Sequence, residues 1–297
     1  MNNLPPGLQV ALSQILKEVG HPDPIIELRS LGGGCINHAS KLVTEKKKYF
    51  LKWNSQSLPN MFTTEALGLR LLSSAKVIRI PEVIQAQETQ AELPAFLLLE
   101  WIERQSNFDQ RKFGHQLAQM HLYSESMRYG LDHDNYIGST PQYNNWHTDW
   151  ISFFRDMRLQ PQIELAVRNN HCGVPRRQKL EQLINRLEDW LKGIPRKASL
   201  LHGDLWAGNV IGDEHSNPVL IDPAVYYGDR EADLAFTQMF GGFSQIFYQA
   251  YHESYPLEPG YQDRFEIYNI YHILNHLNLF GESYGYSLDS VLRRLVG

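Results

Sequence analysis

The sequence predicts an α+β protein in two lobes: a small β-rich lobe over residues 1–103 and a larger helical lobe over residues 104–297. Two observations carry this prediction. In the first third of the chain, apolar residues alternate with polar ones or form short runs bounded by turn residues, as in β-strands. After about residue 104, apolar residues recur at helical spacing instead. The change of period therefore marks the boundary between the lobes.

The first lobe is expected to begin with an amphipathic helix over residues 8–19, where apolar residues share one helical face. Strands follow over residues 27–54, separated by a glycine-rich turn and a lysine-rich turn. A helix over residues 63–74 begins at a threonine and has an early glutamate. Two further strands are expected within residues 80–88 and 94–102, and the second is an apolar run that ends in charge.

The second lobe is expected to consist of six helices, with a short β-like insert between the third and the fourth. The helices are placed at residues 108–125, 146–168, 177–192, 230–253, 261–280 and 287–296. The third has one continuous apolar stripe, which is typical of a helix packed against a core. The insert contains most of the polar residues on which the functional prediction depends.

Composition excludes several classes of partner. Hydrophobic residues make up 42% of the chain, charged residues 21%, and the formal net charge is −5. Because no broad basic field is present, neither nucleic acid nor a membrane is expected as a partner. No apolar run approaches the roughly 18 residues of a membrane span, and the N-terminus does not resemble a signal peptide. The two cysteines, Cys35 and Cys172, cannot form a disulfide framework, so we expect a cytoplasmic location. A monomer or a homodimer is expected.

Three charged residues stand where packing does not require them. Lys52 lies within an apolar strand, Glu65 lies near the start of the next helix, and Asp222 follows three apolar residues. Phosphoryl transfer uses a lysine that steadies the α- and β-phosphates, a glutamate that holds this lysine, and an aspartate that binds Mg²⁺. These residues therefore indicate a kinase that uses ATP and Mg²⁺.

The segment HGDLWAGN supplies the remaining parts. His202, Asp204 and Asn209 fit the pattern H-x-D-x-x-x-x-N, in which the aspartate accepts the hydroxyl proton and the asparagine binds Mg²⁺. His202 is expected to orient this loop. Trp206 is expected to pack on a sugar face. Asp233 either hydrogen-bonds the backbone of the loop or simply provides a negative charge at a helix start.

The glycine-rich turn lies between two predicted strands, where a phosphate-covering loop belongs. It is not a Walker loop, because no Lys-Ser or Lys-Thr pair follows it. The residues predicted to bind nucleotide are Gly32, Gly33, Gly34, Cys35 and Asn37. Backbone N–H groups that favour phosphate also favour a thiolate, so Cys35 is a candidate for reversible oxidation; alternatively, it is a small residue selected for fit.

His272 and His276 lie one helical turn apart and share a face of a predicted helix. Two histidines at this spacing can bind a metal ion. Because no acidic ligand lies between them, a structural role or a contact with substrate is favoured.

With these motifs, the sequence resembles the fructosamine kinases, also called ketosamine-3-kinases, within the aminoglycoside/choline kinase-like group of the protein-kinase-like fold. The resemblance covers nearly the whole chain. The motifs that carry it include GGGCINHAS (32–40), HGDLWAGN (202–209), DPAVYYGDREADLA (222–235) and LNHLNLFG (274–281). The second and third together are specific to this family.

The resemblance implies ATP- and Mg²⁺-dependent phosphorylation of the 3-hydroxyl of ketoamines, which are sugar adducts of free amines or protein lysines. It implies Asp204 as the base, Asn209 and Asp222 as metal ligands, and Lys52 with Glu65 as the pair that orients the phosphates. The phosphorylated adduct then falls apart, so the implied role is deglycation. Alternatives are a kinase for another amine or a sugar alcohol, and a nucleotide-binding pseudokinase. The pseudokinase is disfavoured because all five catalytic positions are present.

The resemblance also places the nucleotide base and the sugar. The segment Glu100, Trp101 and Ile102 would be the hinge that contacts adenine through backbone groups. Trp206 and His276 would line the sugar pocket. One departure from the family pattern is Leu279, which stands where a second histidine is common, and it leaves the sugar preference open.

Overall fold

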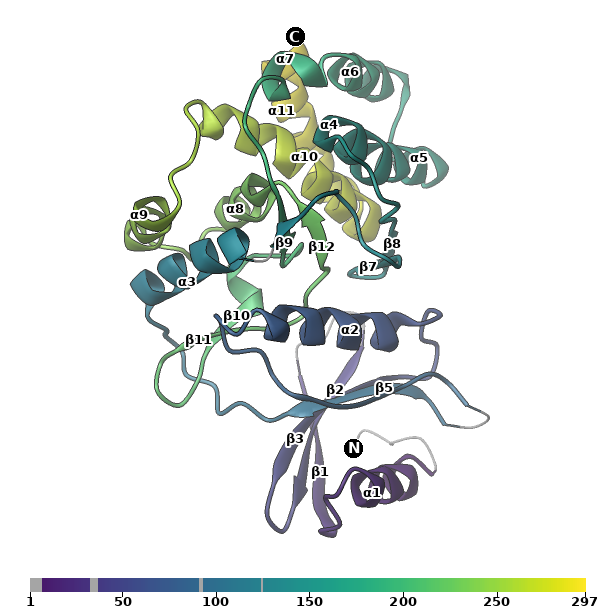
Figure 1. The fold of residues 1–297 in the computed structure, drawn as a ribbon. Coiled ribbons are helices and arrows are strands. Elements are labelled where there is room, and N and C mark those ends of the chain that lie inside the picture. The colour runs from purple at the N-terminus through teal and green to yellow at the C-terminus, as the bar shows by residue number, and fades with distance from the viewer. Residues whose placement is uncertain (1–6, 33–36, 91–92, 124) are drawn as a thin grey trace. The chain divides into compact units, whose positions relative to one another are not determined.

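The computed structural model describes residues 7–32, 37–90, 93–123 and 125–297. Contacts between residues divide the chain into two compact units, each of which is described separately (Figure 1). Unit 1 comprises residues 1–108 and 211–222, and unit 2 comprises residues 109–210 and 223–297. The sequence had suggested one boundary after residue 103, which leaves residues 211–222 with the helical lobe. In the structure this segment belongs to unit 1.

Unit 1 is built on an antiparallel five-stranded sheet with the strand order β1-β2-β3-β5-β4. Its elements are α1 (Leu8–Glu18), β1 (Ile25–Leu31), β2 (His38–Thr44), β3 (Lys48–Asn54), α2 (Met61–Ser74), β4 (Val83–Gln87) and β5 (Ala95–Glu100). Helices α1 and α2 lie on opposite faces of the sheet (Figure 1). All of these elements were expected from the sequence, within a few residues at their ends.

Strand β3 places its side chains alternately on the two faces of the sheet. Tyr49, Leu51 and Trp53 are buried in one core cluster with apolar residues of α1. Lys52 therefore points to the opposite face, the one that α2 covers. The alternation that builds the core beneath α1 thus also directs the lysine toward α2.

The hairpin of β10 (Val210–Gly212) and β11 (Pro218–Leu220) brings residues 211–222 into unit 1. Ile211 and Val219 form a buried apolar cluster with Ile102. The amide N–H of Gln105 donates to the carbonyl of Gly212 at 2.9 Å. These contacts join segments about a hundred residues apart in sequence, which local periodicity does not reveal.

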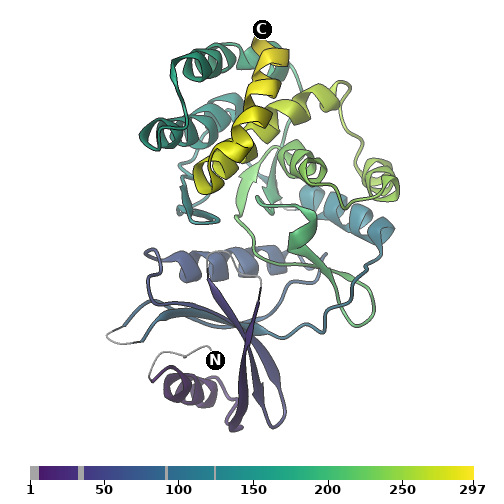
Figure 2. The ribbon, with the colours of Figure 1, turned by 180° about the vertical axis from the view of Figure 1, so that it is seen from behind.

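Unit 2 is mainly helical and also contains two small sheets, β12-β9-β6 and β7-β8. Its helices are α3 (Gln110–Tyr123), α4 (Trp150–Phe153), a π-helix (Phe154–Leu159), α5 (Gln160–Arg168), α6 (Val174–Asn185), α7 (Leu187–Leu191), α8 (Arg230–Met239), α9 (Gln245–Ser254), α10 (Tyr261–Phe280) and α11 (Gly285–Val296), with short 3₁₀ turns at Ala207–Asn209 and Glu282–Tyr284. Its strands are β6 (Glu125–Ser126), β7 (Asn135–Ile137), β8 (Thr140–Gln142), β9 (Ala198–Leu201) and β12 (Tyr226–Gly228). Figure 2 shows α10 and α11 from behind.

Two of the predicted helices are interrupted in the structure. The helix expected over residues 230–253 is two helices, because Gly241 and Gly242 adopt φ angles of 69° and 95°, which end a right-handed helix. The helix expected over residues 177–192 begins earlier, with Pro175 in its first turn, and breaks at Arg186. No helix in the described residues is long and apolar enough to cross a membrane.

Candidate active site

Unit 1 contains a compact ion cluster centred on Lys52. Its Nζ atom lies 2.6 Å from Oε1 of Glu65 and 2.7 Å from Oδ1 of Asp222. Lys52 is only 9% exposed, and burial alone would lower its pKa. The attraction of Asp222 and Glu65 outweighs burial and raises the pKa of Lys52 above its ordinary value. The lysine is therefore a fixed positive charge at neutral pH, held between two carboxylates from distant parts of the chain.

Asp222 occupies a strained position two residues after the end of β11. Its φ angle is 55°, in the left-handed region that a non-glycine residue adopts rarely. Aspartate tolerates this region better than most residues. Its side chain is 44% exposed, whereas the carboxylate of Glu65 is largely covered and its pKa is raised, chiefly by burial. Asp222 can therefore reach a ligand while it contacts Lys52, whereas Glu65 serves to hold the lysine.

The predicted hinge residues are held by contacts within unit 1. Oε1 of Glu100 lies 2.7 Å from Nη2 of Arg79, and Oε2 accepts from the Glu82 amide at 3.2 Å. The ring of Trp101 lies 4.3 Å beneath Nζ of Lys41. Because the carboxylate of Glu100 bonds within the fold, its side chain organises the hinge. Ile102 is buried with the β10-β11 hairpin.

The glycine-rich turn is described only at its ends. Gly32 is exposed at the end of β1. Oδ1 of Asn37 accepts from Nδ2 of Asn54 at 3.0 Å. Gly33, Gly34 and Cys35 lie outside the described residues, so their roles in nucleotide binding and oxidation remain predictions.

Unit 2 carries the loop that follows β9, and it brings Asp204 and Asn209 together. Nδ2 of Asn209 donates to Oδ2 of Asp204 at 2.9 Å and to the Asp204 carbonyl at 2.8 Å. The nitrogen side of the amide thus faces Asp204, and the oxygen Oδ1 points the other way. His202 is fully buried, and its Nδ1 accepts from the Asp204 amide at 3.2 Å.

Asp233 of α8 holds the backbone of this loop through hydrogen bonds. Its Oδ2 accepts from the His202 amide at 2.7 Å, and its Oδ1 accepts from the Gly203 amide at 2.9 Å. His121 of α3, also buried, places Nε2 3.3 Å from the same carboxylate. His121 was not singled out from the sequence, because a buried histidine within a helix has no distinguishing local pattern.

The loop that follows β9 requires glycine at position 203. The φ angle of Gly203 is 80°, and a Cβ atom added there would lie 1.9 Å from the carbonyl oxygen of Ala224. The backbone on both sides is fixed, since the Ala224 amide donates to the His202 carbonyl at 2.9 Å. The close approach of two backbone segments therefore requires glycine.

Gly203→Ala is expected to lower the free energy of unfolding by more than about 2 kcal/mol and to abolish activity, because the alanine collides with backbone that cannot yield. Gly193→Ala is the matched control. Gly193 has a φ angle of 76° but no atom within 4 Å of an added Cβ, so it should cost only the conformational strain of about 1 kcal/mol. Chemical unfolding of both variants measures the difference. An equal decrease in the free energy of unfolding would show that the collision at Gly203 does not contribute.

The two predicted sugar-pocket residues are linked by a third that the sequence did not reveal. The ring of Trp206 covers Gly208, where an added Cβ would lie 2.2 Å from the indole. Phe240 contacts both candidates: its ring centroid lies 5.8 Å from that of Trp206 and 5.1 Å from that of His276. Phe240 sits in the α8–α9 turn, inside what the sequence predicted to be one continuous helix.

His272 and His276 are held as neutral side chains. Nδ1 of His276 lies 2.8 Å from the His272 carbonyl, and burial lowers the pKa of His276. His272 stacks on Phe236, with centroids 3.7 Å apart and planes 4° apart. Burial, with a smaller repulsion from His276 and Arg158, lowers the pKa of His272 well below its ordinary value. The geometry favours packing over a metal pair. Among the described residues, no group of three or more His, Cys, Asp and Glu side chains is placed to hold a metal ion.

The lowered pKa of His272 makes stability depend on pH. Below about pH 6.5 the unfolded chain binds a proton that folded His272 does not, so stability is lost as the pH falls, by up to about 1.4 kcal/mol per pH unit. His272→Phe preserves the stacked ring and removes this loss. Chemical unfolding between about pH 7 and pH 5 should show a shallower decline for the variant; identical declines would mean that His272 is not held neutral.

The model of the fructosamine kinase family matches residues 8–297. The chain belongs to the fructosamine kinase family. It is 41% identical to a probable ketoamine kinase of Synechocystis, over 98% of both chains, and 39% identical to a chloroplastic protein-ribulosamine 3-kinase of Arabidopsis thaliana, over 92% of this chain and 83% of the relative.

Solved structures agree with the assignment to the fructosamine kinase family. A candidate fructosamine-3-kinase of Haemophilus somnus 129PT shares 32% identity and a TM-score of 0.89, over 98% of both chains. The aminoglycoside phosphotransferase APH(4)-Ia, solved with ADP and hygromycin B, shares 16% identity and a TM-score of 0.66, which is likeness of fold alone. The predicted fold class, α+β and protein-kinase-like, is confirmed.

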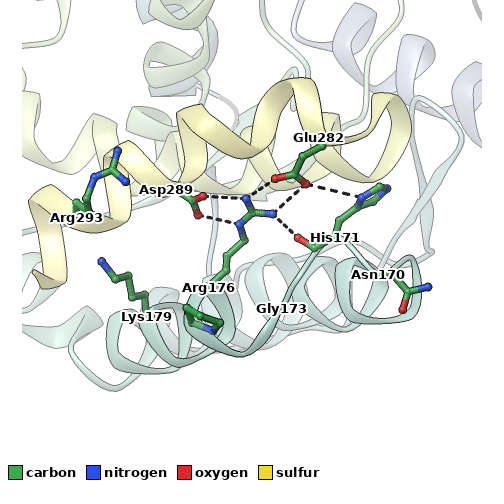
Figure 3. A pocket seen from close by; sticks show the side chains of 9 residues that line it. Asn170, His171, Gly173, Arg176, Lys179, Glu282, Asp289 and Arg293 are labelled. Carbon is green, nitrogen blue, oxygen red and sulfur yellow. Dashed lines mark hydrogen bonds and ion pairs between the residues drawn. The ribbon is translucent and has the colours of Figure 1, made fainter.

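A pocket of about 660 Å³ in unit 2 is lined by none of the predicted site residues (Figure 3). Arg176 occupies its centre, with Nε 2.8 Å from Asp289 and Nη2 2.6 Å from Glu282, and it also donates to the His171 carbonyl. These bonds fasten α6 to the start of α11. Since the guanidinium is already bonded on several sides, the pocket is best explained as the surface of a structural ion network.

Proposed function

We propose that this protein is an ATP-dependent kinase that phosphorylates the 3-hydroxyl of ketoamines, either free or bound to protein lysines. The observation that carries the proposal is the match of residues 8–297 to the fructosamine kinase family. Two groups of side chains in contact support it, Lys52–Glu65–Asp222 and Asp204–Asn209. The names of the relatives, ketoamine kinase and protein-ribulosamine 3-kinase, support ketoamines as the substrate class.

Asp204 is proposed to accept the proton of the attacking hydroxyl. The hydrogen bond from Asn209 to Oδ2 fixes the orientation of the carboxylate, and the buried Asp233 holds the loop backbone through two N–H groups. A positioned base of this kind contributes by orienting the nucleophile as well as by taking up its proton. Lys52, held by Glu65, is proposed to position the phosphates of ATP.

The donor atoms of Asn209 and Asp222 suit Mg²⁺. Both offer oxygen, which this cation prefers, and the amide of Asn209 already directs its nitrogen toward Asp204. Mg²⁺ in kinases is held by few protein ligands together with phosphate oxygens, so a cluster of three titratable side chains is not required. When bound, Mg²⁺ would neutralise the charge that develops on the phosphate oxygens.

The proposed product accounts for a role in deglycation. Phosphate on C3 lies next to the C2 ketone of the adduct. Once the ketone enolises toward C1, the phosphate leaves from C3 with the C–O bonding electrons, and the resulting adduct releases the amine on hydrolysis. The enzyme itself needs to perform only the transfer. We keep the cytoplasm as the expected location, and a monomer or homodimer as the expected state.

A substrate panel tests the proposal. With Mg·ATP, the protein should phosphorylate fructosamines or ribulosamines, and kcat/KM for these should exceed that for aminoglycosides, choline and sugar alcohols by at least about a hundredfold, the discrimination that a site built for specific polar groups can supply. Higher activity on an amine or sugar alcohol without a ketoamine group would favour the alternative hypothesis, a kinase for another amine or a sugar alcohol. ATP binding without turnover of any compound would favour a pseudokinase.

A further inference from the structure

Unit 2 presents a connected row of aromatic side chains that begins two residues beyond Asp204. We call it the aromatic row; its members are Trp206, Phe240, His276, Phe280 and Tyr284. Neighbouring ring centroids are 5.8 Å apart for Trp206–Phe240, 5.1 Å for Phe240–His276, 5.6 Å for His276–Phe280 and 5.0 Å for His276–Tyr284. Trp206, Phe240 and Phe280 are 37%, 44% and 51% exposed. Single exposed aromatic residues are common, but connected ones mark binding surfaces.

The row is held in place by the backbone beneath it. The indole of Trp206 lies directly over Gly208, where an added Cβ would stand 2.2 Å from the ring and would displace it. The turn that carries Phe240 closes on the same loop, since a Cβ added to Gly242 would lie 2.4 Å from Cβ of Ala207. The contact of His276 with the His272 carbonyl fixes its ring. A surface fixed in this way loses little conformational entropy when it binds a ligand.

The chemistry of the row suits a cation on an apolar stem. Four of its members present aromatic faces, which attract ammonium groups and also bury alkyl chains. With Nδ1 of His276 directed at a carbonyl oxygen, Nε2 of this neutral ring can accept a hydrogen bond.

The two ends of the aromatic row differ in their relation to the proposed base, Asp204. Trp206 lies two residues beyond the proposed base in the chain, and the contacts lead from it through Phe240 and His276 to Phe280. In a ketoamine, the nitrogen is attached to C1, on the far side of the ketone from the C3 that carries the reacting hydroxyl. With the sugar at Trp206, the amine and its substituent extend along the rest of the row.

We propose that the aromatic row binds the amine side of the ketoamine, so that Phe240 and Phe280 set a preference for ketoamines of long alkylamines and lysine side chains. This inference rests on the proposed function, and it names the part of the substrate that the enzyme selects. Ketoamines formed on the α-amino group of a free amino acid should be poorer substrates, because their carboxylate adjoins the nitrogen and the faces of aromatic rings attract cations rather than anions.

A series of fructosamines made from methylamine, propylamine and hexylamine tests the inference. For the wild-type protein, kcat/KM should rise about tenfold or more from methyl to hexyl, as burial of methylene groups predicts. Phe280→Ala and Phe240→Ala should each raise KM for the hexyl substrate several-fold, and leave KM for ATP and for the methyl substrate within about twofold. Tyr286→Ala is the matched control, since Tyr286 is an exposed aromatic residue of unit 2 outside the row and should change neither.

The 1-O-hexyl ether of fructose separates the two contributions, because it keeps the stem and the 3-hydroxyl but lacks the positive charge. Phe280→Leu keeps apolar area and loses the aromatic face, so it should narrow the preference for the amine over the ether several-fold. The inference is overturned if kcat/KM of the wild-type protein does not depend on the length of the alkyl chain. It is also overturned if both alanine variants keep the wild-type dependence on chain length. Either result leaves the proposed function intact. A wild-type protein that phosphorylates no ketoamine overturns the proposed function, and the inference with it.

Discussion

Replacing Asp204 by asparagine is expected to lower kcat by about 10²–10⁴-fold, the contribution of a positioned general base, while the affinity for Mg·ATP stays within about twofold. The amide has nearly the shape of the carboxylate but cannot take up the hydroxyl proton. It can still accept from Nδ2 of Asn209, so the loop should keep its conformation. Steady-state kinetics with a ketoamine measures the first effect, and calorimetric titration with nucleotide measures the second.

Asp189→Asn is a suitable control for this experiment. Asp189 is an exposed carboxylate of unit 2 that pairs with Arg186 at 2.9 Å, and its loss should leave kcat unchanged. An Asp204→Asn protein that keeps more than about half of its kcat would remove Asp204 from the role of base, since a lost base costs far more. Joint loss of turnover and nucleotide affinity would indicate a wider disturbance of the loop.

Asp222→Asn is expected to reduce turnover by at least about a hundredfold and to abolish the gain in ATP affinity that Mg²⁺ provides, because Asp222 would hold the Mg²⁺ that neutralises the phosphate charge. Asparagine is chosen because it tolerates the φ angle of 55° that Asp222 adopts. Lys52 retains its contact with Glu65, so the strand that carries it should remain in place. Calorimetry with ATP in the presence of Mg²⁺ and of EDTA measures the change.

Glu214→Gln is the control for Asp222. Glu214 is a partly exposed residue of the β10-β11 hairpin that pairs with Arg79 at 3.2 Å, and its replacement should preserve both turnover and the Mg²⁺ effect. If Asp222→Asn still binds Mg·ATP more tightly than ATP alone, to the same degree as wild type, the metal site has been misassigned.

The sequence predicted those features that short-range patterns encode. Alternation along β3 separates Lys52 from Leu51 and thereby places the lysine on the face that meets Glu65. The spacing H-x-D-x-x-x-x-N brings Asp204 and Asn209 together, because both lie in the short loop between β9 and β10. In each case the determining information lies within a few residues.

Features that depend on distant contacts could not be predicted in this way. The hairpin of residues 211–222 joins unit 1 through Arg79, Ile102 and Gln105, which lie about a hundred residues earlier. His121 reaches Asp233 across a similar separation. Phe240 was placed within a helix, because apolar residues on both sides of Gly241 and Gly242 continue the helical period.

The position of the transferred phosphate tests the central claim most directly. Fructosamine labelled with ¹³C at C3 can be incubated with the wild-type protein and Mg·ATP, and the product followed by ¹³C and ³¹P NMR. The account predicts that the C3 signal becomes split by coupling to phosphorus, and that free amine and inorganic phosphate then accumulate together as the adduct breaks down. A phosphorus coupling at any other carbon, or ATP hydrolysis without a phosphorylated sugar, would contradict it.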